Sequence, residues 1–548
     1  MDQSFFKMSK SLEPLGTGLS LIEVDGVDND GFLKSVINDL EEELKINIKE
    51  QKWYTILNNV NMEYRNELST LTKIFGHPYV KMEQGSIKLH TNTTTEMEIN
   101  MDAIRDVSRY AVKNFLKNYI IDHNEWPPLK EGTESLLSPI FQEARKMRRT
   151  PESLKHKYKE IPLSDYDNVI LGKVMNFETY KNFLPYLKDK TISDLKEDFC
   201  KFLYETRNIN GIYKSNIDTK AYYSRSSKIT KRNTRLLFHY LVNSIKDLDH
   251  VGFTNHYTLR DWIIIINHFI IRIVPKEKEL KDIFRGFGCQ TFFNRARCLV
   301  QEMNVKSFLD KYCDEQAMTL GELEFKRKMR GLRNLQKVFK NHTMIYVNID
   351  ADKWNNRFRS LSVKDPCATV LDRIFDYPIF SKTQDYYENC FFYVPDNQQC
   401  YHWESQKGGI EGLNQDTWVF VYVNMIHMSM RSFNMPYFVL CKGDDLRVVI
   451  AVPPEIVKRE NMNKLRLKIV QEIKEKCETV GQFIKIDDSY ASQNYFCFNK
   501  IASVRNIELP QAFRKIQKVY GENNAMRRSL DLFISGCYSN GHSASAVS

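Results

Sequence analysis

The chain has 548 residues, of which 42% are hydrophobic and 27% are charged, and its net charge is +10. This length and composition exclude an intrinsically disordered chain and allow a large buried core, while the modest positive charge is compatible with a polyanionic partner. The 11 cysteines include no Cys-x-x-Cys pair, so the sequence predicts a reducing compartment and no structural zinc site.

The first half of the chain predicts mainly helices and no membrane span. Residues 1–4 are too polar to begin a secretory signal peptide, and acidic helical patterning covers residues 33–48. Residues 100–340 are expected to be largely helical, with several basic clusters. The most apolar window, residues 262–274, is too short and too polar to cross a bilayer, so we expect a buried helix or strand there.

From residue 343 the pattern changes to short apolar strands separated by helices. Residues 344–349 form one predicted strand, which runs directly into Asp350. Two further runs, residues 437–441 and 446–452, flank the turn residue Gly443 and predict a hairpin. Strands of this kind after a helix-rich first half predict an α+β fold, organised as one multi-lobed unit.

The predicted hairpin carries two adjacent carboxylates, Asp444 and Asp445, at its tip. Carboxylates held this close repel one another unless a cation lies between them and a partner, although an ordinary Gly-Asp turn is the simpler explanation of an isolated motif. Asp350 is a second carboxylate at a strand end, for which a helix N-cap is the alternative. Two-metal phosphoryl transfer requires carboxylates from separate segments that converge, as Asp350 and Asp444 would.

Two other segments suggest phosphate or nucleic-acid contacts. A basic segment could neutralise a triphosphate, or could be a solvated helix of mixed charge; its cationic residues are Lys276, Lys278, Lys281 and Arg285. The pair Gly408-Gly409 precedes a helical pattern over residues 416–430. Such a loop lets the backbone approach a nucleotide closely, although a plain loop has the same composition, and the P-loop spacing is absent.

The order of these segments resembles motifs F, A, B and C of RNA-dependent RNA polymerases. Residues 350–356 resemble the DxxKWNN string of the large (L) protein of non-segmented negative-strand RNA viruses, and residues 403–413 resemble its W-x-GQ-x-GG-x-EGL string. Residues 276–285 are similar to its KERELK…GR. Further similar blocks extend the resemblance from about residue 67 almost to the C-terminus: GHP at 76–78, WPP at 126–128, motif D at 481–492 and motif E at 498–500.

The chain departs from the family pattern at a few positions. The family usually has GDN where this chain has Gly443-Asp444-Asp445, so Asp444 keeps the first carboxylate and Asp445 adds a charge that could change the metal preference. Three other substitutions are Ser405 for a glycine, Asp488 for a glutamate and Phe284 for a glycine. They indicate a divergent lineage or a viral insertion in a host genome, and none removes a group that the chemistry requires.

The resemblance implies a right-hand polymerase fold of the α+β class, with an antiparallel palm sheet and helix-rich fingers. We expect four regions: an N-terminal helical segment over residues 1–66, a fingers-like region over 67–342, a palm over 343–510, and the start of a thumb over 511–548. The last residues indicate a cut edge, so the thumb is expected to be truncated. No capping or methyltransferase region is assigned.

The resemblance also implies roles for individual residues. Mg²⁺, or Mn²⁺ as an alternative, is expected to bind Asp350, Asp444 and Asp445. Lys485 joins them as a candidate general acid for pyrophosphate, with an exposed strand-edge lysine as the alternative. Asn355 stands where polymerases read the ribose 2′-hydroxyl. The residues expected to bind nucleotide or RNA are Lys276, Lys278, Lys281, Arg285, Asn355, Gly408, Gly409, Glu411 and Gln415.

The implied function is RNA-directed RNA polymerase activity, which transfers nucleotides from NTPs to an RNA 3′ end in viral replication and transcription. The implied partners are template and product RNA, NTPs, a viral phosphoprotein and nucleoprotein-coated RNA. The implied location is the virion and host cytoplasm, or the nucleus for some related viruses. An inactive RNA-binding remnant of the same fold is the main alternative, and a two-metal nuclease is a more distant one. The sequence leaves open whether the chain is part of a longer L protein or a domesticated insertion.

Overall fold

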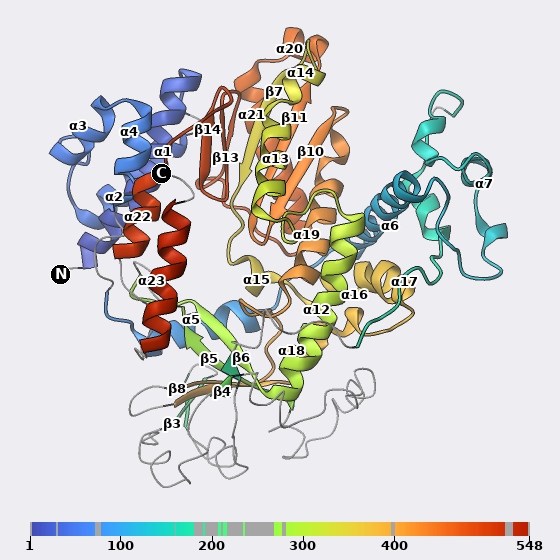
Figure 1. Ribbon diagram of the computed structural model, residues 1–548, viewed down its shortest axis with the longest axis horizontal. Coiled ribbons are helices and arrows are strands. Elements are labelled where there is room, and N and C mark those ends of the chain that lie inside the picture. The colour runs from blue at the N-terminus through green and yellow to red at the C-terminus, as the bar shows by residue number, and fades with distance from the viewer. Residues whose placement is uncertain are drawn as a thin grey trace.

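The computed structural model combines helices with largely antiparallel sheets, which confirms the α+β prediction (Figure 1). It describes residues 3–28, 31–71, 78–158, 160–179, 190–191, 207–209, 212–215, 234–235, 268–276, 281–395, 400–520 and 530–545. In the part of the chain described, no helix combines the length and apolarity needed to cross a bilayer.

A four-stranded antiparallel sheet lies at the centre of the fold. Its strands, in the order β10-β11-β7-β12, are β10 (Tyr437–Lys442), β11 (Asp445–Val452), β7 (Thr343–Ile349) and β12 (Tyr490–Ser492). The predicted strand and hairpin are therefore confirmed. Side chains alternate between the two faces of the sheet, as the pleat requires, and each face joins a different hydrophobic cluster.

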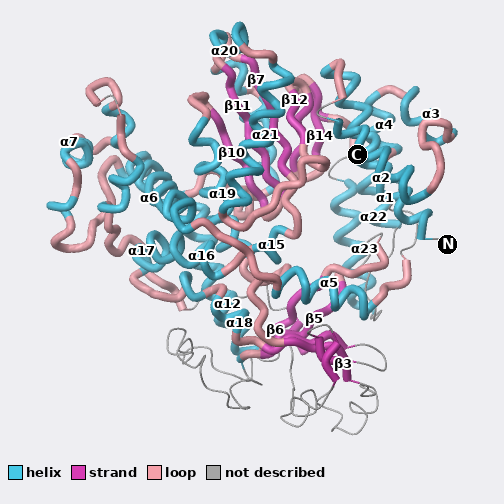
Figure 2. Tube along the Cα trace, turned by 180° about the vertical axis from the view of Figure 1, so that it is seen from behind, coloured by secondary structure: helices cyan, strands magenta, loops and turns pink. Residues whose placement is uncertain are grey.

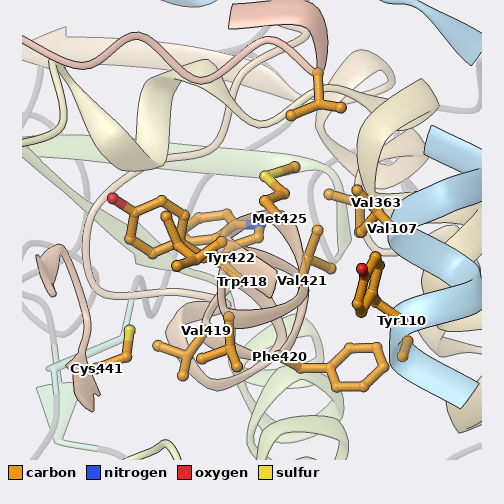
Figure 3. Close-up of a cluster of buried hydrophobic side chains, with 14 of the residues drawn as sticks. Val107, Tyr110, Val363, Trp418, Val419, Phe420, Val421, Tyr422, Met425 and Cys441 are labelled. Carbon is orange, nitrogen blue, oxygen red and sulfur yellow. The ribbon is translucent and has the colours of Figure 1, made fainter. Parts of the chain in front are cut away.

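Helices cover one face of this sheet. Helix α19 (Gln415–Ser429) confirms the helix predicted over residues 416–430, and it packs against α21 (Met462–Thr479) and β10 (Figure 2). Because α19 has no polar face, it is buried on all sides. Figure 3 shows Trp418, Tyr422 and Met425 of α19 in a cluster with side chains of α6 (Met101–His123) and α16 (Ser360–Cys367).

The opposite face is covered by a small three-stranded sheet and by α13 (Glu322–Arg333). The small sheet consists of β13 (Tyr495–Phe498), β14 (Ile501–Val504) and β15 (Ile507–Glu508). The ring centre of Phe496 lies 5.3 Å from that of Tyr346 of β7, and the ring centre of Phe498 lies 5.6 Å from that of Phe325 of α13. These aromatic contacts seat the β13–β14 hairpin on the central sheet.

The N-terminal helices form a second core with C-terminal segments. The helices are α1 (Gln3–Asp25), α2 (Phe32–Leu44), α3 (Lys52–Asn59) and α4 (Met62–Leu68), and their cluster includes Tyr490 and Tyr495. Helix α2 confirms the helical pattern predicted there. Figure 1 shows these helices, in blue, beside α22 (Ala512–Tyr520) and α23 (Leu530–Ser545), in red. A buried ion pair of 3.1 Å joins Asp25 to Arg466 of α21.

A second sheet makes the prediction of mainly helices over residues 100–340 incomplete. Its six strands, in the order β2-β3-β9-β8-β5-β6, are Arg207–Ile209, Ile212–Ser215, Cys400–Trp403, Phe391–Pro395, Ile270–Pro275 and Gly286–Gln290. The β-branched run of β5 favours a strand, and it resolves the helix-or-strand alternative for that end of the apolar window. The β5–β8 pair is parallel, and the other pairs are antiparallel.

Further α-helices and strands surround these layers. Among the described residues they are β1 (Lys190–Thr191), β4 (Thr234–Arg235), α5 (Met82–Thr94), α7 (Pro139–Lys146), α12 (Phe292–Tyr312), α14 (Leu335–Val338), α15 (Trp354–Arg357), α17 (Arg373–Phe375), α18 (Asp385–Glu388) and α20 (Pro454–Arg459). Strands β1 and β4 pair with each other. Helix α12 packs along α19, and α5 contacts both α15 and β9. Through α5, the six-stranded sheet is connected to the segment that follows β7.

Candidate active site

The two carboxylates predicted to converge lie at the same edge of the four-stranded sheet. Asp350 directly follows β7, and Asp444 lies in the two-residue turn between β10 and β11. Because Ile349 pairs with Leu446, the end of β7 lies beside the hairpin turn. Asp350 is not a helix N-cap, since α15 begins at Trp354 and Lys353 caps it. Gly443 has φ +68°, so the turn uses a backbone conformation that glycine adopts readily.

Both carboxylates have a raised affinity for a proton. Partial desolvation raises the pKa of Asp350, with Asp488 and Asp444 adding to the effect and Lys485 opposing it. Desolvation likewise raises the pKa of Asp444, and the charges of Asp445 and Glu411 contribute. No described residue forms an ion pair with Asp444. Carboxylates in this condition favour a bound cation as well as a proton.

The donor set at this edge fits a hard divalent cation. Asp350 and Asp444 offer oxygen ligands from two chain segments, and the side chain of Asp350 is 48% exposed. Within the described ranges, no group of three or more His, Cys, Asp or Glu side chains is arranged to enclose a metal. Mg²⁺ and Mn²⁺ suit such an open site, because they bind through a few carboxylates and keep water or phosphate oxygens as their other ligands.

Lys485 lies against Asp350. Its Nζ is 3.3 Å from Asp350 Oδ2 and 3.2 Å from Asp488 Oδ2, and its backbone N–H donates to the carbonyl of Asp350. Partial burial would lower the pKa of Lys485, but these two carboxylates outweigh it and raise the pKa. Lys485 therefore stays protonated at neutral pH, close to the predicted metal ligands.

Asp445 faces a different set of groups from Asp444. Its Oδ1 lies 2.7 Å from Arg447 Nη1, and its Oδ2 accepts a 2.6 Å hydrogen bond from the backbone N–H of Asn499. Asp445 and Arg447 are two residues apart on β11, so both point to the face covered by the β13–β14 hairpin. The two adjacent aspartates of the hairpin thus have separate environments.

The basic segment lies at the open end of the β5–β6 pair. Lys276 follows β5 and forms an ion pair with Glu411, and its Nζ lies 5.2 Å from the ring centre of Phe287. Its backbone N–H donates to the carbonyl of Arg285. The positive charge of Arg285 acts on Asp444, where it lowers the pKa against the larger opposing effects. Lys278 lies outside the described residues.

The two loop glycines are needed for close packing. A Cβ at Gly409 would lie 2.2 Å from Trp418 Cζ2, and a Cβ at Gly408 would lie 2.2 Å from the carbonyl oxygen of Asn356. The backbone N–H of Gly408 donates to Thr93 of α5, and Asn356 Nδ2 donates to the carbonyl of Gly409. The loop is therefore held tightly against the segment that carries Asn355, whose side chain hydrogen-bonds to no described residue.

Glu302 of α12 fixes the start of α19. Its oxygens accept from the backbone N–H groups of Asp416 and Thr417, and from the side chains of Thr417 and Asn414. Gln415, a predicted RNA contact, is the first residue of this helix. The side chain supplies acceptors that the first turn of a helix lacks. Burial, followed by the charge of Asp416, raises the pKa of Glu302 to about 8.

Three residues at or near the site carried no recognisable signal in the sequence. Glu302 lies in a helix of mixed polarity and Arg447 in an apolar strand, and the partners of both can be identified only in three dimensions. Lys10 of α1 is a lysine in an ordinary helical pattern. Loss of hydration, followed by the charges of Lys281 and Lys485, lowers the pKa of Lys10 to about 8. Helix α1 therefore adds a further lysine to the cationic groups near the carboxylate edge.

The chain is similar to viral proteins that are named RNA-directed RNA polymerase L. The RNA-directed RNA polymerase L of Rice yellow stunt virus is 21% identical over 527 residues, covering 90% of this chain and 25% of that protein. The corresponding protein of Vesicular stomatitis New Jersey virus is 24% identical over 469 residues, covering 79% of this chain and 20% of that protein. The chain spans about a quarter of the length of these curated relatives. The family model described as Mononegavirales RNA dependent RNA polymerase matches residues 1–541, and the chain belongs to that family.

Proposed function

We propose that this chain is the polymerase core of an RNA-directed RNA polymerase, which adds nucleotides from NTPs to the 3′ end of an RNA. The observation that carries this proposal is the placement of Asp350 and Asp444 at one edge of an antiparallel sheet, with Arg285 of the basic segment acting on Asp444. Membership of the polymerase family supports it.

In the proposed architecture, the four-stranded sheet with α19 and α21 is the palm, within residues 343–510. The helices and strands of residues 67–342 belong to the fingers, with residues 1–66 as an N-terminal helical segment and 511–548 as the start of a thumb. The packing of α5 against the loop of Gly408 and Gly409 supports a direct connection between the proposed fingers and palm.

Asp350 and Asp444 are the residues that would hold Mg²⁺ or Mn²⁺. When bound, such cations activate the attacking 3′-hydroxyl and neutralise the leaving pyrophosphate. Lys485 is placed to donate a proton to the pyrophosphate, since its raised pKa keeps it charged beside Asp350. Asn355 is proposed to read the ribose 2′-hydroxyl, because its side chain is available for an external hydrogen bond.

The cationic groups are proposed to bind the incoming triphosphate. Lys276 must leave Glu411, or share its charge, when phosphate oxygens arrive. Lys281, Arg285 and the undescribed Lys278 complete the predicted set, and the tightly packed loop of Gly408 and Gly409 supports the template side of the site. Viral phosphoprotein and nucleoprotein-coated RNA are proposed partners, in the virion and host cytoplasm, or in the nucleus for some relatives.

Primer extension tests the proposal. Purified protein is given a primed RNA template, labelled NTPs and either Mg²⁺ or Mn²⁺, in parallel with Asp350→Ala and Asp444→Ala. We expect extension by the parent protein only, with a loss of about a thousandfold in each variant. Extension that neither substitution reduces would refute the assignment of these carboxylates. Salt-dependent RNA binding without any extension would instead identify an inactive remnant, and cleavage of the RNA would identify a nuclease.

A further inference from the structure

Asp445 occupies the position at which this chain departs from its family's usual asparagine, and the structure gives its side chain two partners. Oδ1 pairs with Arg447 at 2.7 Å, and Oδ2 accepts from the backbone of Asn499 at 2.6 Å. Each oxygen is therefore already engaged by a donor within the protein. The side chain is 26% exposed, whereas that of Asp350 is 48% exposed.

Arg447, the ion-pair partner of Asp445, contacts strand β13 as well. It is 8% exposed, its Nε donates to the carbonyl of Cys497, and its guanidinium lies 5.8 Å from the ring centre of Phe498. Burial would lower the pKa of Arg447, but Asp445 and its other neighbours raise it. A buried guanidinium of this kind requires a carboxylate partner, because an unpaired buried charge is strongly destabilising.

The segment held by these contacts is the turn of the β13–β14 hairpin. Asn499 and Lys500 form this turn, with φ of 49° and 65°, and both are exposed. The turn lies beside the β10–β11 turn that carries Asp444, because Asp445 is bonded to it. Apolar contacts of Phe496 and Phe498 hold the body of the hairpin, whereas the polar contacts of Asp445 and Arg447 fix its tip.

We propose that Asp445 is a positioning residue, which with Arg447 locks the tip of the β13–β14 hairpin against the catalytic turn and does not bind the metal. This rests on the proposed polymerase function, in which the RNA 3′ end reacts beside Asp444 and therefore close to the tip. An asparagine at this position could still accept the hydrogen bond from Asn499, but it is uncharged and could not balance the charge of Arg447. The negative charge of Asp445 therefore balances the buried positive charge of Arg447.

The proposal is tested with Asp445→Asn, Arg447→Gln and the double variant. Asp487→Asn is a matched control, since Asp487 is an exposed carboxylate near the site that bonds to no described residue. Hydrogen exchange is measured over residues 495–504, and Mn²⁺ binding is measured directly on the RNA-free protein. Neither measurement requires polymerase activity, so failure of this proposal is distinguishable from failure of the proposed function.

We expect Asp445→Asn and Arg447→Gln each to accelerate hairpin exchange about tenfold, with the double variant no faster than the faster single variant. Mn²⁺ affinity should stay at the parent value in Asp445→Asn and fall about tenfold in Asp444→Asn. In extension assays, the half-saturating concentration of primed RNA should rise while that of NTP is unchanged.

A loss of Mn²⁺ affinity in Asp445→Asn equal to that in Asp444→Asn, with unchanged hairpin exchange, would overturn the proposal and make Asp445 a ligand. If Asp445→Asn does not fold, Asp445→Glu provides the second test, because it keeps the charge and alters the reach. Faster hairpin exchange with normal Mn²⁺ affinity in that variant supports the proposal, and the reverse pattern contradicts it.

Discussion

Two groups of carboxylates in this protein have opposite relationships to their surroundings. At the start of α19, Glu302 is buried and accepts hydrogen bonds from two backbone N–H groups, a hydroxyl and an amide. At the edge of the four-stranded sheet, Asp444 is exposed and forms an ion pair with no described residue, while Asp350 has Lys485 as its charged partner. The protein supplies the hydrogen-bond donors of Glu302, whereas the carboxylate edge requires a ligand from outside.

The first prediction separates activity from stability at the two regions. Asp444→Asn should reduce primer extension about a thousandfold without lowering the thermal midpoint, because the native carboxylate adds repulsion and no internal bond. Scanning fluorimetry and single-nucleotide extension would measure the two effects. A variant that loses activity and stability together would show that Asp444 has a structural role, and the comparison would fail.

Glu302→Ala should have the opposite result. Removing this carboxylate leaves the first N–H groups of α19 buried without acceptors, and should lower the free energy of unfolding by about 3 kcal/mol. Chemical denaturation would measure the change. Thr417→Val, which removes one donor from the same cluster, should cost about 1 kcal/mol. Equal costs for both variants would mean that the carboxylate adds nothing beyond one hydrogen bond.

The glycines near each region provide a finer test. Gly409→Ala places a Cβ against the Trp418 ring. It should lower the free energy of unfolding by about 1–3 kcal/mol and displace the loop of Gly408 and Gly409. Gly443→Ala meets no atom within 4 Å, but its φ of +68° should cost about 1 kcal/mol. Denaturation midpoints would rank the two. A larger cost at Gly443 would indicate that turn strain outweighs packing at the loop.

The sequence predicted the parts of this site that depend on local pattern. Apolar runs located β7, the β10–β11 hairpin and α19, and strand ends brought Asp350 and Asp444 to one edge. It did not predict the six-stranded sheet, because β2, β3 and β9 are short and pair with strands far away in the chain. The hairpin contact of Asp445 likewise depends on a residue 54 positions later, which no spacing in the sequence reveals.

The smallest predicted effect is a pH dependence at the carboxylate edge. The pKa values of Asp350 and Asp444 are raised in the folded protein, so the folded state binds these protons more tightly than the unfolded state does. Stability therefore falls as pH rises from the ordinary carboxyl pKa, about 3.9, through the raised values. With a chelator present, Asp444→Asn should raise the thermal midpoint slightly at pH 7 and have less effect at pH 4. The gain in the free energy of unfolding at pH 7 should be less than about 1 kcal/mol, because solvent screens the exposed groups.

Mg²⁺ or Mn²⁺ should reverse this pattern in the parent protein. A bound cation favours the ionised carboxylates, so the metal should raise the parent midpoint at pH 7 more than at pH 4, and should raise that of Asp444→Asn much less. Fluorimetry at both pH values, with and without metal, would measure the difference. Equal metal responses in the two proteins would place the cation elsewhere. Glu302→Ala, if folded, should keep the parent's metal response, because that carboxylate is already satisfied by the protein.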